Sequence, residues 1–147
     1  YNSSRAKMVK PFINLHSMAK KTYTAVSMQQ RTFNTYDAEH VIIYPNEEID
    51  DNYQPESMGD KEKPKPTKAY IYTGEERDGG YIVQCADPTD CHELTNAIIR
   101  TRYSVSDELA LQRHHQEDAE SNIEEWKTYC AFADAAIAKA KKWLGIA

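Results

Sequence analysis

The sequence predicts an α+β fold: a small antiparallel sheet of three or four strands with one hairpin, then two short helices and one long C-terminal helix. Runs of β-branched and aromatic residues are confined to the first 85 residues, whereas apolar residues recur every three or four positions after Pro88. Because the strands come first and the helices last, the two kinds of element should segregate instead of alternating as in βαβ units.

Four runs in the first half of the chain have the composition of strands: residues 22–26, 40–44, 69–73 and 81–85. The last two flank the polar, glycine-rich stretch 74–80, which is typical of a chain reversal. We therefore expect a hairpin between them.

The chain divides into a basic extended N-terminal arm, residues 1–19, and a single α+β domain, residues 20–147. The arm contains a proline and shows no helical or strand period. A start at Met18 is an alternative, in which residues 1–17 are an extension. Within the domain, residues 46–67 hold prolines, acids and lysines but almost no large apolar side chain, which predicts a disordered or loop insertion.

Capping residues mark the two short helices. Asp90 is placed to cap a helix whose apolar positions are Cys91, Leu94 and Ile98. Ser104 or Ser106 is placed to cap the next helix.

The last helix, expected over residues 119–144, carries the clearest pattern in the chain. Its apolar residues are spaced alternately three and four apart, which is a heptad seam: Ile123, Trp126, Cys130, Ala133, Ile137, Ala140 and Leu144. The seam is buried either within the same chain or against a helix of another copy. Its members other than the two alanines are the first candidate interaction residues.

Tyrosine is unusually frequent, with ten in 147 residues. By strand alternation Tyr70 and Tyr72 share one face of their strand. Amphipathic aromatic residues serve either as an economical core or as contacts with a partner. These two tyrosines are the second candidate interaction residues.

Charge is distributed unevenly along the chain. Residues 1–36 hold six basic and no acidic side chains, residues 37–66 hold nine acidic and three basic ones, and the net charge is −5. One alternative function is a nucleic-acid-binding accessory protein, which would use Arg5, Lys7, Lys10, Lys20 and Lys21. The acidic remainder argues against nucleic acid. The other possible ligands of the arm are an anionic surface and an acidic segment of its own chain or of a neighbour.

A small metal or thiol enzyme is a second alternative, using Cys85, Cys91 and His92. Their spacing matches no common zinc site, and neighbours on a helix point about 100° apart, which keeps His92 away from the Cys91 sulfur. The three cysteines fit reduced thiols. We therefore expect no catalytic residue, no metal and no cofactor.

Length and hydropathy exclude other classes. A chain of 147 residues is too short for a barrel enzyme, and no run approaches the roughly 20 apolar residues that span a bilayer. With no secretory hydrophobic region at its beginning, the chain is expected to be soluble and not exported, away from membranes.

Several segments are similar to small proteins of phage and prophage late modules, the virion and tail genes, of gut bacteria. In the helical half these are RTRYS at 100–104, DELALQR at 107–113, EEWKTY at 124–129 and AKAK at 138–141. The strand segments EHVIIYP at 39–45 and YTGEE at 72–76 are similar in character. The resemblance implies a non-enzymatic structural or assembly protein that works as an oligomer or by contacts with other phage proteins. It implies no specific site residue.

Overall fold

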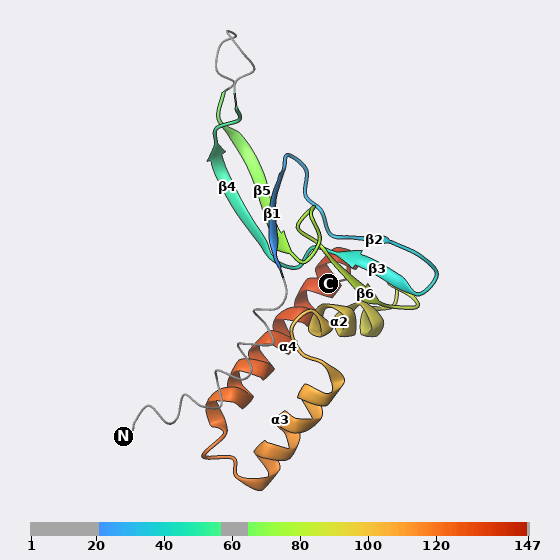
Figure 1. The fold of residues 1–147 in the computed structure, drawn as a ribbon, viewed down its shortest axis with the longest axis vertical. Coiled ribbons are helices and arrows are strands. Elements are labelled where there is room, and N and C mark those ends of the chain that lie inside the picture. The colour runs from blue at the N-terminus through green and yellow to red at the C-terminus, as the bar shows by residue number, and fades with distance from the viewer. Residues whose placement is uncertain (1–20, 57–64, 147) are drawn as a thin grey trace.

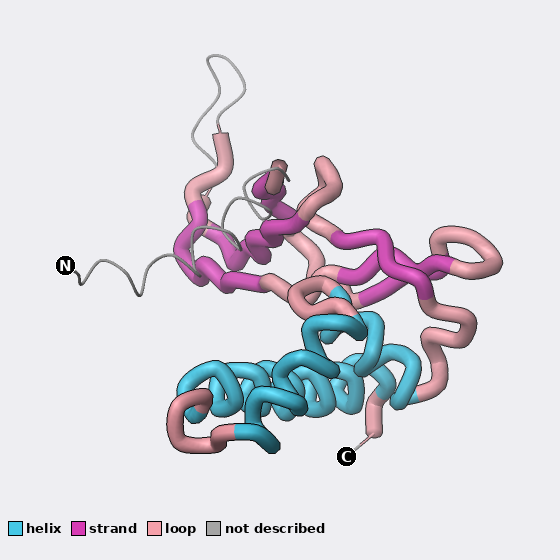
Figure 2. Tube along the Cα trace, turned by 60° about the horizontal axis from the view of Figure 1, so that its bottom comes forward, coloured by secondary structure: helices cyan, strands magenta, loops and turns pink. Residues whose placement is uncertain are grey.

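Six strands precede three helices in a computed structural model that describes residues 21–56 and 65–146 (Figure 1). The strands form two small antiparallel sheets, and the last helix is the longest. The helices gather in one layer and the strands in another (Figure 2). The predicted α+β class is therefore confirmed. The predicted arm, residues 1–19, lies outside the described residues.

The first sheet, here called the projecting sheet, consists of β1 (Tyr23–Ser27), β5 (Thr67–Gly74) and β4 (Glu47–Tyr53), with β5 in the centre. Its strands pack mainly on one another, and β4 and β5 extend away from the helices (Figure 1). Its cross-strand pairs include Val26 with Ile71 and Ile49 with Tyr70.

The second sheet, here called the packed sheet, consists of β2 (Phe33–Thr35), β3 (His40–Ile43) and β6 (Tyr81–Gln84), with β3 in the centre. Pairs of Val41 with Val83 and of Ile43 with Tyr81 place these side chains on one face. This face belongs to the main hydrophobic core, together with the helices.

The expected hairpin between residues 69–73 and 81–85 is wrong, because these segments belong to β5 and β6 in different sheets. Both edges of β5 are taken by β1 and β4, so β6 pairs with β3 instead. The glycine-rich stretch 74–80 does reverse the chain, with the Gly79 amide bonded to the Glu76 carbonyl at 2.9 Å. A turn signal shows where a chain reverses, but the partner of each strand depends on distant residues.

The insertion expected over residues 46–67 is also corrected, because it contains β4 and the first residue of β5. The seven residues of β4 are mostly acidic or polar, and Ile49 is their one aliphatic side chain. They form a strand because the main chain of β5 supplies their hydrogen-bond partners. Pairing between main chains does not require apolar side chains. Residues 57–64 of the expected insertion lie outside the described residues.

The two short helices form where the sequence predicts them. Helix α2 (Cys91–Arg100) has Asp90 at its N-cap position, without a side-chain capping bond. Helix α3 (Val105–Glu117) begins at Ser104, whose hydroxyl accepts from the Asp107 amide at 3.0 Å while the Asp107 carboxylate accepts from the Ser104 amide at 2.9 Å. This capping box settles the choice between the two serines.

Helix α4 (Ile123–Leu144) begins later than residue 119, because Asp118 and Asn122 form a turn between α3 and α4. The helix ends at Gly145, which has a φ of 73°. This left-handed conformation is typical of a glycine that terminates a helix.

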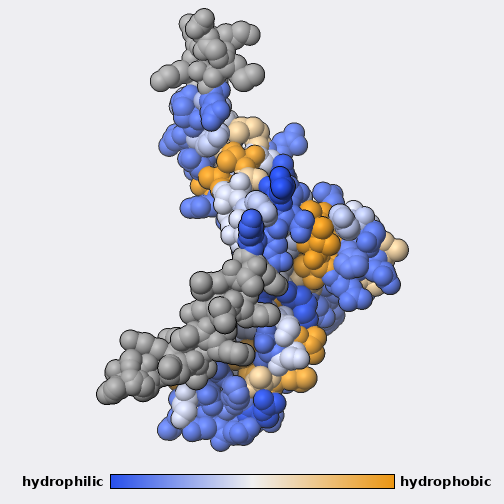
Figure 3. All heavy atoms as spheres, viewed as in Figure 1, coloured by the Kyte–Doolittle hydropathy of each residue, from blue (hydrophilic) through white to orange (hydrophobic). Residues whose placement is uncertain are grey.

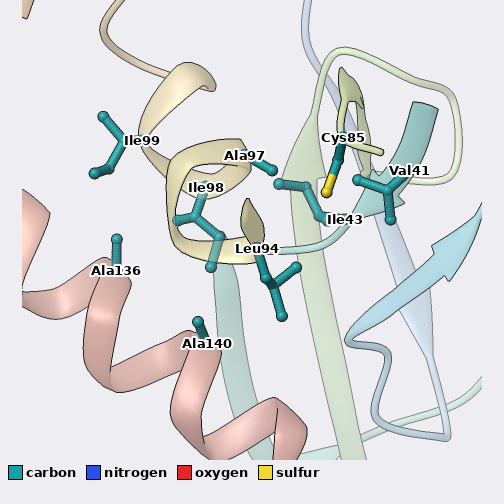
Figure 4. Packing of buried hydrophobic residues seen from close by; sticks show 9 residues of the cluster. All are labelled: Val41, Ile43, Cys85, Leu94, Ala97, Ile98, Ile99, Ala136 and Ala140. Atoms are coloured by element: carbon teal, nitrogen blue, oxygen red, sulfur yellow. The ribbon is translucent and has the colours of Figure 1, made fainter. Parts of the chain in front are cut away.

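The core lies between the packed sheet, α2 and α4. Figure 4 shows α2 between α4 and the strands, with Ala97 turned toward Ile43 and Ile98 turned toward α4. The side chains of Ala136 and Ala140 are buried in α4, and their small size lets α2 approach closely.

The buried face of α4 is not centred on the predicted seam. It is rotated around the helix axis by less than the angle of about 100° that separates consecutive residues. Ala136 and Ala140 are buried at its centre, whereas Ile123 and Ile137 at the far side of the seam are 36% and 40% exposed. Half-buried aromatic residues on the other side complete the buried face: Tyr129, Phe132 and Trp143. The centre of the seam is therefore covered within the chain, and its outer side is open.

Enlarging a buried alanine of α4 should destabilise the fold. We expect Ala140→Leu to lower the free energy of unfolding by about 1–3 kcal/mol, because the leucine has to displace α2. Ala131→Leu is the matched control, since Ala131 lies on the exposed face of the same helix. Urea unfolding followed by circular dichroism measures both, and equal stability of the two variants would contradict the packing of α4 on α2.

Candidate interaction surfaces

The projecting sheet exposes side chains that are usually buried. Residues directly opposite one another in the sheet share a face, so Ser27, Tyr70 and Ile49 form one row across all three strands. Ile49 is 47% exposed and Tyr70 is half-buried. Val26 and Ile71 form the next row, which lies on the opposite face. Figure 3 shows apolar side chains at the surface of this sheet.

The row on the first face is here called the contact patch, with Tyr70 and Ile49 as its large side chains. The Lys68 ammonium lies 5.6 Å from the centre of the Tyr70 ring, a cation–π distance. On β4 the exposed Asp51 follows Ile49 by two residues, whereas Glu48 and Asp50 alternate to the opposite face with Val26 and Ile71. An apolar centre beside charged residues of both signs resembles the anatomy of a protein interface.

Tyr72 has a different role from the predicted one. Its side chain is 0% exposed, so it cannot present a surface to a partner. Its phenol oxygen accepts from the Arg31 amide at 2.6 Å and donates to the Glu47 carboxylate at 2.8 Å. The Tyr72 ring also contacts the Tyr44 ring edge-on, at 5.5 Å between centres. Tyr72 therefore connects the two sheets.

The connection between the sheets is here called the joint: Arg31, Tyr44, Glu47, Tyr72 and Asp78. The Tyr44 hydroxyl donates to the Asp78 carboxylate at 2.6 Å, and the Arg31 guanidinium donates to the Asp78 carbonyl at 3.0 Å. The guanidinium carbon lies 5.6 Å from the centre of the Tyr44 ring and 6.0 Å from that of Tyr72. Each buried polar group named here has a partner, so the joint holds the sheets in one relative orientation.

Two glycines let the turn after β5 lie against the joint. Gly79 has a φ of 84°, and a Cβ there would stand 2.5 Å from the Tyr72 carbonyl oxygen. A Cβ on Gly80 would stand 2.8 Å from the Tyr44 ring. Larger residues would push the turn away from the tyrosines.

Burial dominates the electrostatics of the joint. It raises the pKa of Tyr72 to about 12, and the nearby Glu47 carboxylate acts in the same direction. Burial and the Asp78 carboxylate likewise raise the pKa of Tyr44 to about 12. Both phenols therefore stay protonated hydrogen-bond donors at neutral pH.

The seam residues of α4 do not share one open surface. Trp126 stacks on His115 of α3, with 4.3 Å between ring centres and 11° between ring planes. Cys130 and Leu144 are half-buried, and Ile123 and Ile137 are the exposed members. The outer side of α4 is thus a narrower surface than the sequence pattern indicates.

The contacts that hold α3 are mainly polar. The Arg100 guanidinium pairs with Glu108 at 2.7 Å, and the Tyr129 hydroxyl donates to the same carboxylate. The imidazole of His114 contacts Glu125 at 2.9 Å. None of the residues of α3 is buried, which leaves Val105 and Leu109 exposed.

The structure describes only some of the residues that the two alternative functions, nucleic-acid binding and metal or thiol catalysis, would use. Arg5, Lys7, Lys10 and Lys20 lie outside the described residues, and Lys21 is exposed. Cys85 is a buried free thiol whose pKa is raised by burial, which favours the thiol over the reactive thiolate. Cys91 is half-buried and His92 is exposed. In the part of the chain that the structure describes, no three His, Cys, Asp or Glu side chains converge as a metal site would require.

Comparison with protein-family models, curated proteins and solved structures gave no match. Among residues 21–56 and 65–146, no helix has the length and apolar character to cross a membrane. The candidate interaction surfaces are therefore assigned from the geometry of the structure alone.

Removing the Tyr72 hydroxyl should destabilise the protein more than removing a neighbouring one. Tyr72→Phe leaves the Arg31 amide and the Glu47 carboxylate without this partner, so we expect a loss of about 1–3 kcal/mol in the free energy of unfolding. Tyr70→Phe is the matched control on the same strand and face. Urea unfolding tests both variants, and an equally stable Tyr72→Phe would contradict the role of the joint.

High pH should destabilise the fold through the same phenols. The folded pKa of Tyr72 and of Tyr44 lies above the ordinary phenol value of 10.0, so their stabilising effect is complete below pH 10 and is lost as the pH rises toward 12. Urea unfolding across this range should show the decline. The decline should be smaller in Tyr72→Phe, and an equal decline in that variant would exclude Tyr72 as a cause.

Proposed function

We propose that this protein is a non-enzymatic structural or assembly protein of phage type, which assembles with further copies of itself through the contact patch. The observation that carries the proposal is the projecting sheet, whose row of Tyr70 and Ile49 is not packed under any of the helices that the structure describes. Apolar side chains on a small sheet with open edges favour association with another protein surface.

The charges around the contact patch favour a second copy as the partner. Lys68 precedes Tyr70 by two residues on β5, and the exposed Asp51 follows Ile49 by two residues on β4. Two patches related by a twofold axis can bring the lysine of one copy to the aspartate of the other. Self-complementarity of this kind is a property of a homodimer contact.

The joint supports the same proposal, because it orients the projecting sheet before any partner binds. A surface held in its bound orientation loses less conformational entropy on association. The buried hydrogen bonds of Tyr72 and Tyr44 therefore contribute to binding as well as to folding.

The resemblance to phage late-module proteins favours a virion or tail-assembly role, in the host cytoplasm or in the particle. Repeated copies of one small chain are the usual material of such assemblies, and closed symmetry follows from a self-complementary contact. The exposed seam residues Ile123 and Ile137 provide a second contact along α4 for other structural proteins.

A charge in the contact patch should disrupt self-association. We expect the chain of residues 1–147 to show a concentration-dependent molar mass in size-exclusion chromatography with light scattering, and Ile49→Lys to have a lower molar mass at each concentration with an unchanged circular dichroism spectrum. Val26→Lys is the matched control, since Val26 is similarly exposed on the opposite face of the same sheet.

An unmodified chain that is monomeric at every concentration would contradict the proposal. So would an Ile49→Lys variant that associates like the unmodified chain.

A further inference from the structure

The packed sheet has an open edge along β6. In its antiparallel ladder the Cys85 amide bonds to the Glu39 carbonyl at 2.8 Å, so alternate residues of β6 face β3. Val83 and Tyr81 follow Cys85 in this alternation, which turns the backbone N–H and C=O groups of Ile82 and Gln84 away from β3. Among the residues that the structure describes, none is bonded to these outward groups.

A groove of about 690 Å³ runs along this open edge. One wall is formed by the consecutive residues 81–86, as expected where the edge of a strand faces a groove. The other wall is formed by residues of α2 that lie on one face of the helix: Glu93, Asn96 and Arg100. A strand edge that faces a groove is the arrangement into which an extended segment binds by strand addition.

The groove is acidic. Glu75 and Glu93 line its walls, and Arg100 is paired with Glu108 at 2.7 Å. Asp87 and Asp90 stand near Cys85 at one end, where their charges and that of Glu93 act on its thiol. A second β6 edge would bring the same acids and be repelled, so the groove suits a basic strand.

The chain itself contains one strongly basic segment. Residues 1–21 hold five basic and no acidic side chains. Between Lys7 and Leu15 this segment also carries four apolar side chains, two on each side of Pro11: Met8, Val9, Phe12 and Ile13. Charge and hydropathy therefore match this segment to the groove.

We propose that the N-terminal segment of one copy binds as an added strand along β6 of a second copy, in the groove between β6 and α2. Its backbone pairs with the outward groups of Ile82 and Gln84, and its lysines face the acids of the groove. This arm exchange rests on the proposed self-assembly and names a second site for it, separate from the contact patch.

Cross-linking between isotopically distinct copies tests the arm exchange in the chain of residues 1–147. A photoreactive amino acid replaces Val9, and light and heavy-isotope copies are mixed, irradiated and analysed by mass spectrometry. We expect cross-links between light and heavy chains at residues 81–86 and on α2. Cross-links that join residues of one chain only, or that fall outside the groove, would overturn the proposal.

Proline substitutions test whether the N-terminal segment pairs with the main chain of β6 or only lies near the groove. Ile82→Pro removes an outward donor from β6 without removing a bond to β3, and should lower the inter-copy cross-links by about tenfold or more. Thr35→Pro is the matched control, because its amide faces outward on β2, the opposite edge of the same sheet. Unchanged cross-linking in a folded Ile82→Pro variant would overturn the proposal.

A charge reversal keeps the test valid if the proline variant does not fold. Glu93→Lys should weaken the inter-copy cross-links, and Lys10→Glu in the same chain should restore them. Equal cross-linking in all three chains would overturn the proposal.

Light scattering of the variants distinguishes failure of the arm exchange from failure of the proposed function. Association lost in Ile49→Lys but kept in Ile82→Pro, without cross-links in the groove, would overturn the arm exchange alone. Association kept in Ile49→Lys but lost in Ile82→Pro would overturn the contact patch and support the arm exchange.

Discussion

The buried hydroxyl of Tyr72 connects the two halves of the strand layer. It lies on the central strand of the projecting sheet, accepts from the Arg31 amide just before β2, and donates to Glu47 at the start of β4. Arg31 and Tyr44 extend this network to Asp78 in the turn that leads to β6. The orientation of the projecting sheet, and so of the contact patch, depends on these few polar contacts.

The hydrophobic core is small, and its location explains why the contact surfaces lie elsewhere. Most buried aliphatic residues belong to the packed sheet and α2, and α4 contributes chiefly alanines and flanking aromatic residues. The projecting sheet gains its order from cross-strand pairing and from the joint. Its faces are therefore free to carry apolar residues for contact at little cost to the stability of the core.

The contact patch and the groove along β6 are proposed as two different kinds of binding surface. The patch offers side chains on a sheet face, whereas the groove offers main-chain groups along a sheet edge. The first depends on shape and apolar area, and the second on backbone pairing and charge. A chain that uses both has two independent contacts for each copy, which is what an extended assembly requires.

Local sequence signals determined the helices, the α+β order and the position of most strands. The capping box at Ser104, the period of α2 and the final glycine of α4 act within a few residues of where they occur. For this reason they can be predicted from the sequence. Strand alternation likewise places Tyr70 and Tyr72 on one face of β5.

Only the tertiary structure decided which strands pair, which side of α4 is buried, and that Tyr72 lies in the joint while Tyr70 lies on a surface. The edges of β5 are taken by β1 and β4, which is a competition between segments far apart in the chain. The polar strand β4 forms because β5 supplies its hydrogen-bond partners, and α4 turns toward α2 because alanines permit close approach. In each case the deciding free energy comes from contacts between distant segments. The sequence of one segment alone therefore does not determine the outcome.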